Sequence, residues 1–205
     1  MKKLYITTLI FLLFCLASCG KSEKKETITA LTSEKWINAY TGEAYSFNED
    51  GTGTHGNLSI TYTISENELL IMEGASATKA DSYTLDFSSE IKRITPENAK
   101  TYYVTESDYE TVGKAIREES IQTLTSVEWW TRVLGTNYIQ FDKIGVGWYL
   151  ETSGTRQFSW EMASNTSVTI TLDGEGTMTL NIVNDDGDLK LVNANTHTTV
   201  YVPKK

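Results

Sequence analysis

Cysteine is nearly absent from this sequence. The 205 residues include two cysteines, Cys15 and Cys19, and both lie in the first nineteen positions. The chain after Cys19 therefore has no thiol, which excludes disulfides and cysteine-based metal or redox sites there. A fold built from this chain has to be stabilised by packing, and 40% hydrophobic residues provide enough apolar material for a core.

Histidine and basic residues are also scarce. His55 and His197 are the only histidines, and neither has a second histidine or a cysteine at metal-ligand spacing, so we expect no metal site and no cofactor. Without Lys2 and Lys3, which lie in the export signal described below, 16 basic residues face 27 acidic ones, a balance of −11. This charge repels phosphate backbones, so we expect no nucleic-acid partner.

Recognisable catalytic motifs are missing as well. The chain has no Gly-x-Ser-x-Gly turn and no glycine-rich phosphate loop. The acidic run Asn184–Asp188 is suggestive of calcium, but a calcium-loop alignment puts Ile182 at the first ligand position, so a hairpin turn is the better interpretation. Paired carboxylates identify a glycosidase only when their separation is known. We therefore expect a protein that is not an enzyme.

The first nineteen residues have the features of a bacterial export signal. Lys2 and Lys3 precede a nearly continuous apolar run, residues 4–16, which is shorter than the about 20 residues that span a bilayer. The run ends in Leu-Ala-Ser-Cys, residues 16–19, which resembles the lipobox of bacterial lipoproteins. The resemblance implies that a signal peptide, residues 1–18, is removed and that Cys19 receives a diacylglyceryl group and a further acyl chain such as palmitate.

The residues after Cys19 suggest where the lipid anchor takes the protein. Gly20 replaces the aspartate that resembles an inner-membrane retention signal, so the resemblance implies the outer membrane, on its periplasmic or its surface face. Residues 19–30 begin with a charged run that predicts a solvated, lipidated tether. The alternative is an ordinary secretory signal in which Cys19 occurs by chance.

The rest of the chain is a tandem repeat. Leu-Thr-Ser-Glu-Lys-Trp, residues 31–36, returns 93 residues later as Leu-Thr-Ser-Val-Glu-Trp, residues 124–129. Each copy continues through a tyrosine and a phenylalanine into a turn with two glycines, at an offset of 93 for Tyr45 and Tyr138 and of 94 for Phe47 and Phe141. We therefore predict two repeats, residues 31–104 and 124–205, with one inserted residue between Tyr138 and Phe141.

Within each repeat the apolar residues alternate with polar ones, which predicts β-strands. Ile60, Tyr62 and Ile64 show this period of two, and we expect seven or eight short antiparallel strands in each copy. In the second copy Val168 and Ile170 are aligned with Leu70 and Met72. The predicted fold is all-β, with two tandem meanders, each a small barrel.

A different pattern occurs between the repeats, at residues 105–123. Ser107 with Glu110 matches a helix capping box, and Tyr109, Val112, Ala115 and Ile116 fall on one helical face. We expect a short helix packed against a repeat, since Gly113 within it costs about 1 kcal/mol relative to alanine. A flexible acidic linker is the alternative.

The order of aromatic strands and glycine turns resembles the lipocalin-like domain of bacterial lipoproteins. The matching residues are Trp36, Phe47, Gly51, Gly53, Tyr62, Ile64 and Tyr103 in the first copy and Trp129, Phe141, Gly145, Gly147, Trp160 and Tyr201 in the second. The resemblance implies two lipocalin-like barrels and says little about function. The second copy lacks the Asp-Gly pair of the first turn, so we expect a looser or bulged hairpin at residues 142–145.

Extra aromatic residues in the second copy are the candidate binding site. Trp148 and Tyr149 are neighbours in a predicted strand and point to opposite faces, so at most one is part of a one-sided core. One interpretation is that Trp129, Phe158 and Trp160 fill the barrel while the others pack under the neighbouring repeat. The alternative is that Trp148 or Tyr149, with Arg156, binds a small apolar ligand or stacks on a glycan.

These observations favour a lipid-anchored envelope protein with a non-enzymatic binding role. The expected ligand is a small apolar molecule in a barrel mouth or a glycan on exposed aromatic residues. The second hypothesis is a module that docks a protein partner in an outer-membrane assembly, because a flat apolar patch favours a partner whereas a concave pocket favours a ligand.

Overall fold

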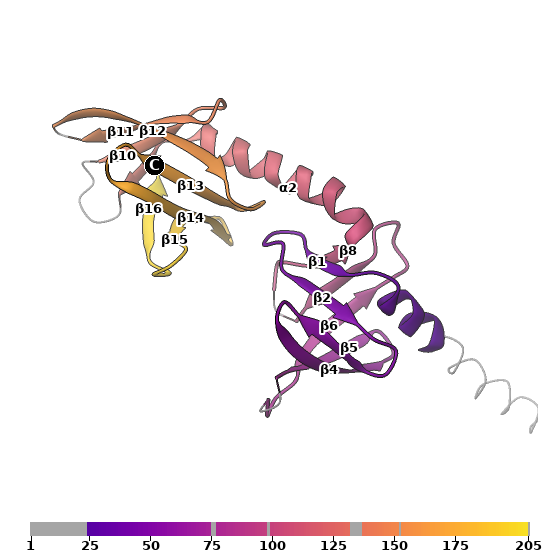
Figure 1. Ribbon diagram of the computed structural model, residues 1–205. Coiled ribbons are helices and arrows are strands. Elements are labelled where there is room, and N and C mark those ends of the chain that lie inside the picture. Colours follow the sequence, from indigo (N-terminus) through magenta and orange to yellow (C-terminus); the bar gives the residue numbers. More distant parts are fainter. Residues whose placement is uncertain (1–23, 75–76, 98, 132–136, 152, 205) are drawn as a thin grey trace, which may run out of the picture. The chain divides into compact units, whose positions relative to one another are not determined.

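The computed structural model describes residues 24–74, 77–97, 99–131, 137–151 and 153–204 (Figure 1). Cys19 and the expected signal peptide, residues 1–18, lie outside the described residues. Contacts between Cα atoms divide the chain into two compact units, Met1–Asn38 with Glu43–Tyr109 and Ala39–Gly42 with Glu110–Lys205. Each unit contains one closed barrel of eight antiparallel strands, which confirms the predicted all-β fold.

The first barrel is an up-and-down meander in which each strand pairs with the next. It closes where β8 pairs with β1, with Val104 opposite Ile37. Its strands are β1 (Trp36–Asn38), β2 (Ala44–Phe47), β3 (Thr52–His55), β4 (Leu58–Ser65), β5 (Glu68–Glu73), β6 (Asp81–Asp86), β7 (Arg93–Pro96) and β8 (Tyr103–Thr105).

The second barrel has the same order and closes where β16 pairs with β9, with Val202 opposite Trp130. Its strands are β9 (Trp129–Thr131), β10 (Tyr138–Phe141), β11 (Val146–Glu151), β12 (Gly154–Met162), β13 (Ser167–Leu172), β14 (Gly176–Asp185), β15 (Asp188–Asn193) and β16 (Thr199–Pro203).

The barrel interiors are built by the predicted alternation of apolar and polar residues. Ile60, Tyr62 and Ile64 are buried in β4 while the residues between them are exposed. In the second barrel Phe158 and Trp160 are buried in the same way, and Trp129 is fully buried. These three aromatic side chains fill the second barrel, as the first of the two interpretations in the sequence analysis predicted.

The helix expected between the repeats is α2 (Glu106–Ser126), and it is longer than predicted. It begins before Ser107, so the predicted capping box at Ser107 is wrong. Thr105 Oγ1 donates to the Asp108 carboxylate at 2.8 Å, and the Ser107 N–H donates to Glu34 at 3.2 Å. These bonds provide a negatively charged N-terminus, which stabilises a helix.

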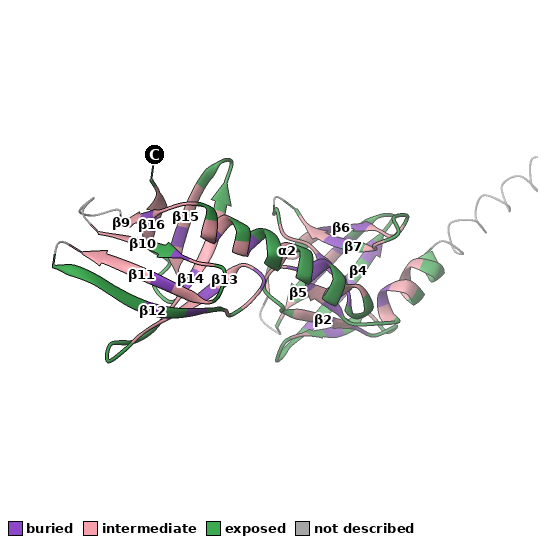
Figure 2. Ribbon diagram, turned by 90° about the horizontal axis from the view of Figure 1, so that it is seen from above, coloured by how far each residue is buried: buried purple, intermediate pink, exposed green. Residues whose placement is uncertain are grey.

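Only part of the predicted apolar face of α2 is buried. Val112 is buried, but Ala115 is exposed, and Figure 2 shows that much of the helix is exposed. Gly113 is buried, and a Cβ atom there would come within 2.5 Å of the Asn165 amide in the β12–β13 turn. The glycine that weakens the helix therefore permits its close approach to that turn.

The repeated Leu-Thr-Ser-x-x-Trp motif joins the end of a helix to the first strand of a barrel. Residues 24–32 form a helix, so most of the segment expected to be a solvated tether is ordered. Trp36 Nε1 donates to the Leu31 carbonyl at 2.8 Å, and Trp129 Nε1 donates to the Leu124 carbonyl at 3.0 Å. All four of these side chains are fully buried. Each barrel thus has its own leading helix, and residues 117–125 of α2 are the counterpart of residues 24–32.

The strand pairing in the two barrels corrects the sequence alignment of the two copies. Trp36 lies opposite Tyr45 and Trp129 lies opposite Ile139, so Ile139 and not Tyr138 is the counterpart of Tyr45. The inserted residue therefore lies before Ile139, and its predicted position between Tyr138 and Phe141 is wrong. The buried residues Val168 and Ile170 similarly match Leu69 and Ile71, not Leu70 and Met72.

The hairpin at residues 142–145 is not looser than its counterpart. Gly51 and Gly145 have φ angles of 85° and 82°, and the closing bonds are 2.8 Å from Asn48 N to Thr52 O and 2.9 Å from Asp142 N to Val146 O. Asp142 Oδ1 accepts two backbone N–H bonds inside the turn. Its carboxylate stabilises the turn without the Asp-Gly pair, so the prediction of a looser or bulged hairpin is wrong.

Neither helix in the described part of the chain has the combination of length and apolar character needed to cross a membrane.

Candidate functional site

The structure separates the three residues predicted to form a site. Tyr149 faces the interior of the second barrel, where it packs against the core and is hydrogen-bonded to Tyr201. The Arg156 guanidinium lies 5.4 Å from the centre of the Tyr149 ring. Trp148, the neighbour of Tyr149 in β11, is on the outer face and is half-buried. Tyr149 and Arg156 therefore belong together, and Trp148 belongs to a different surface.

Arg156 is already occupied by two carboxylates. Its guanidinium donates to Glu175 and, at 2.9 Å, to Glu151. The bond to Glu175, followed by the bond to Glu151, raises the pKa of Arg156. Burial and the interaction with Tyr149 raise the pKa of Tyr201. An anionic ligand would have to displace both carboxylates, so this cluster stabilises the rim of the barrel and offers no free cation.

Trp148 lies at the centre of a polar row on the outer face of the second barrel. It pairs with Gln140 on β10 and with Gln157 on β12, so the three side chains share one face of three adjacent strands. Both glutamines are exposed, and neither amide forms a hydrogen bond within the described residues. The indole is thus flanked by two free groups that can each donate and accept hydrogen bonds.

A second row on the same outer face is apolar. Leu150, Tyr138, Trp130 and Val202 follow one another across four neighbouring strands. The rings of Trp130 and Tyr138 are stacked, with centroids 5.5 Å apart and an angle of 15° between their planes. Lys204 Nζ lies 5.2 Å from the Trp130 ring centre. We call Trp130, Tyr138, Trp148, Gln140 and Gln157 together the aromatic face.

The first barrel shows that the fold does not require this surface. The residues at the positions of Trp130 and Tyr138 are Ile37 and Ala44, which pair in the same register. The row equivalent to Gln140, Trp148 and Gln157 consists of Ser46, Thr54 and Ser59. Small side chains therefore suffice on the outside of a closed barrel of this kind, and the aromatic face is a property of the second copy alone.

Sequence reasoning singled out Trp130 and Trp148 as extra aromatic residues of the second copy, but not Tyr138, Gln140 or Gln157. Tyr138 was aligned with a core tyrosine, and the strand pairing places it outside. Gln140 and Gln157 carry no motif, and only the register brings them to Trp148. Tyr138 could have been found from the predicted pairing of its strand with that of Trp130. Residues that lie opposite each other in paired strands point to the same face of the sheet.

The acidic run that the sequence analysis considered as a possible calcium site has a structural role. Asp185 pairs with Asp188 across a two-residue turn, and the Gly187 N–H donates to Asn184 Oδ1 at 3.0 Å, so the predicted hairpin turn is confirmed. Within the described residues, no group of three or more histidine, cysteine, aspartate or glutamate side chains could hold a metal ion.

Comparisons of the chain with protein-family models, with curated proteins and with solved structures found no match.

Proposed function

We propose that this protein is a lipid-anchored envelope protein that binds a glycan on the aromatic face of its second barrel without transforming it. The observation that carries the proposal is the row of Gln140, Trp148 and Gln157. An indole offers a flat apolar surface to the C–H face of a sugar ring, and adjacent amides can bond to its hydroxyl groups. No comparable row exists among the equivalent residues of the first barrel.

The sequence supports a location of this binding surface in the cell envelope. The lipobox-like residues 16–19 support acylation of Cys19, and two or more acyl chains give a stable membrane anchor. The barrel pair is consistent with two lipocalin-like domains. An acidic chain favours an uncharged glycan over an anionic one, because the balance without the signal peptide is −11, from 16 basic and 27 acidic residues.

A protein partner is the second candidate for the same face. The apolar row of Leu150, Tyr138, Trp130 and Val202 extends beyond what a sugar ring needs. Apolar rows with aromatic residues are typical of docking surfaces. A glycan site depends on Trp148 and the two glutamines, whereas a docked protein depends on Leu150 and Val202, so the two functions predict different sensitive residues.

The test is the affinity of the chain from Gly20 onward for a panel of neutral oligosaccharides, measured by tryptophan fluorescence and calorimetry. Trp148→Ala should weaken binding roughly tenfold without lowering the melting temperature, since the lost contact is with the ligand. Thr54→Ala, at the equivalent position of the first barrel, is the matched control and should leave the affinity unchanged. Equal losses of affinity and thermal stability would instead assign Trp148 to the fold.

A panel without any binding would exclude the glycan. Leu150→Ala and Val202→Ala should then reduce the recovery of an envelope protein crosslinked to the second barrel, while Gln140→Ala and Gln157→Ala should not.

A further inference from the structure

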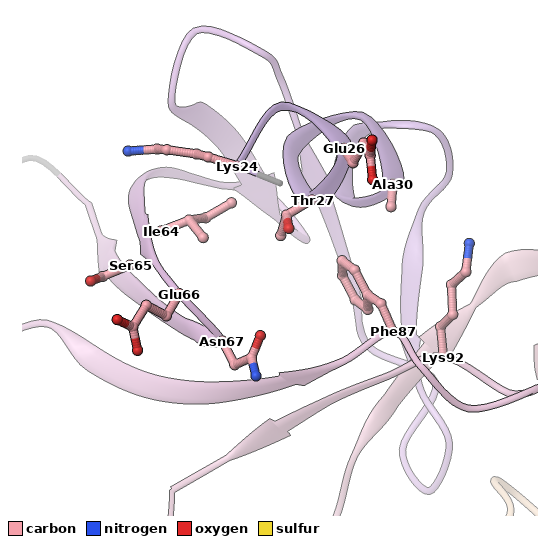
Figure 3. Close-up of a pocket in the computed structure, with 10 residues that line it drawn as sticks. All are labelled: Lys24, Glu26, Thr27, Ala30, Ile64, Ser65, Glu66, Asn67, Phe87 and Lys92. Atoms are coloured by element: carbon pink, nitrogen blue, oxygen red, sulfur yellow. The ribbon is translucent and has the colours of Figure 1, made fainter. Parts of the chain in front are cut away.

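The first barrel carries a cavity of about 940 Å³ at a site unrelated to the aromatic face. It lies between the helix of residues 24–32 and the end of the barrel where β4 turns into β5 (Figure 3). The helix contributes Thr27 and Ala30, the β4–β5 hairpin contributes Ile64, and the segment between β6 and β7 contributes Phe87 and Lys92. This volume is within the range of small-molecule sites, roughly 300–1,000 Å³.

The groove has a rigid apolar floor. The half-buried ring of Phe87 is stacked on the fully buried Trp36, with centroids 5.2 Å apart and an interplanar angle of 16°. Trp36 in turn donates to the Leu31 carbonyl at the end of the helix. Ile64 ends the buried row of β4 beside this floor. The floor is therefore held by the same motif that joins the helix to the barrel.

The second barrel has no equivalent segment. In the first barrel β6 ends at Asp86 and β7 begins at Arg93, so residues 87–92 are free to form a wall. In the second barrel β14 and β15 continue to a two-residue turn, Asp186–Gly187, and the position of Phe87 falls within β14. The groove thus results from an interrupted hairpin that the barrel fold does not need.

The groove is lined by equal numbers of basic and acidic residues, Lys24 and Lys92 with Glu26 and Glu66, so a preference for an anion depends on where each charge lies. Lys24 and Lys92 line the cavity, and neither ammonium group forms an ion pair within the described residues. Of the two acidic residues in the lining, Glu26 already has an interaction partner. Figure 3 shows Lys92 on the side of Phe87, with Glu66 across the cavity near Ile64. An unpaired ammonium next to an aromatic floor suits a molecule with a carboxylate and an aliphatic part.

We propose that this groove binds a small aliphatic monocarboxylate, whose chain packs on Phe87 and Ile64 and whose carboxylate accepts a hydrogen bond from Lys92. The carboxylate replaces the water around an unpaired ammonium, and the chain removes apolar surface from water. The proposal is independent of the glycan function, because the groove and the aromatic face belong to different barrels.

The test is a titration of the chain from Gly20 onward, which contains every described residue, with octanoate. Binding is measured by calorimetry and by tryptophan fluorescence, since a ligand on Phe87 perturbs the stacked Trp36. We expect saturable binding of octanoate, about tenfold weaker binding to Lys92→Gln, and unchanged binding to Lys79→Gln, which removes an exposed lysine outside the groove. An unchanged melting temperature of Lys92→Gln keeps the comparison free of folding effects.

Two further probes complete the test, one positively charged and one uncharged. Octylammonium and octyl glucoside have an aliphatic chain of similar length without the carboxylate, and both should bind at least tenfold more weakly than octanoate. Equal binding of all three probes, or equal affinity of Lys92→Gln and the unmodified chain for octanoate, would overturn the carboxylate site. The absence of any octanoate binding would overturn the proposal altogether, whatever the result of the glycan panel.

Discussion

The two barrels have the same strand order, but their interiors differ at the positions of Tyr45 and Tyr83. In the first barrel the Tyr45 hydroxyl donates to Glu73 at 2.7 Å and shares a 2.9 Å hydrogen bond with Tyr83. His55 Nδ1 lies 2.7 Å from the same Glu73 oxygen, and the imidazole is stacked on Tyr45 with centroids 4.0 Å apart. In the second barrel the residues in the register positions of Tyr45 and Tyr83 are Ile139 and Leu180.

The comparison shows which features belong to the fold and which do not. The second barrel closes without the Tyr45–Tyr83 pair, since Ile139 and Leu180 are fully buried in those positions. A buried polar network is stabilising only when its members are satisfied, because each unpaired group costs its desolvation. The shared Leu-Thr-Ser-x-x-Trp motif belongs to the fold, whereas the polar network is specific to the first barrel.

The largest expected effect concerns the shared motif and tests whether the barrels are equivalent there. Trp36→Ala and Trp129→Ala each remove a fully buried indole and its hydrogen bond to a leucine carbonyl. We expect each substitution to reduce the free energy of unfolding by about 3–5 kcal/mol. Urea denaturation followed by circular dichroism measures both. A loss confined to one of the two variants would contradict the equivalence of the motif.

The next effect separates the interiors. Glu73→Leu introduces an apolar residue, like those in the interior of the second barrel. It leaves Tyr45 and His55 without their shared acceptor. We expect a loss of about 2–3 kcal/mol, since His55 Nδ1 loses its partner and Tyr45 keeps only its hydrogen bond to Tyr83. Urea denaturation provides the measurement, and Glu90→Leu, at an exposed position, is the control. A neutral Glu73→Leu variant would show that the network does not stabilise the first barrel.

The smallest effect is a dependence of stability on alkaline pH. Burial raises the pKa of Tyr103 from its ordinary value of 10.0 to about 12, and burial likewise raises the pKa of Tyr45 and Tyr83. Above pH 10.0 the unfolded state releases a proton that the folded Tyr103 retains until about pH 12, so stability falls with rising pH over this window. By pH 12 the loss from Tyr103 is about 2 kcal/mol.

This alkaline loss is measured by urea denaturation at several pH values together with the ultraviolet absorbance of tyrosinate. Tyr103→Phe should reduce the slope of stability against pH in this window. An unchanged slope would contradict the raised pKa of Tyr103. Burial raises the pKa of three tyrosines in the first barrel, Tyr45, Tyr83 and Tyr103, and of Tyr201 in the second, so the first barrel should be the more sensitive of the two.

The alternation of residues was sufficient to predict the strands, the repeated Leu-Thr-Ser-x-x-Trp motif the tandem repeat, and the apolar residues at helical spacing the helix between the copies. The helix of residues 24–32 was not predicted, because its exposed face is charged and its buried face consists of little more than Ile28 and Leu31. Part of the candidate site was predicted correctly, since Trp148 and Tyr149 do point to opposite faces. The partners of Trp148 could not be predicted, because they come from two other strands.

The sequence by itself determined the period of two, the glycines with positive φ in the turns, and the leucine and tryptophan that join each leading helix to its barrel. These are local properties, decided by residues within a few positions of one another. Tertiary structure alone decided that Ile139 lies inside and Tyr138 outside, because a one-residue slip in strand register exchanges the two faces. It also brought Tyr45 to Glu73, 28 residues away, and placed Phe87 on Trp36, since closing a barrel joins side chains that no local pattern connects.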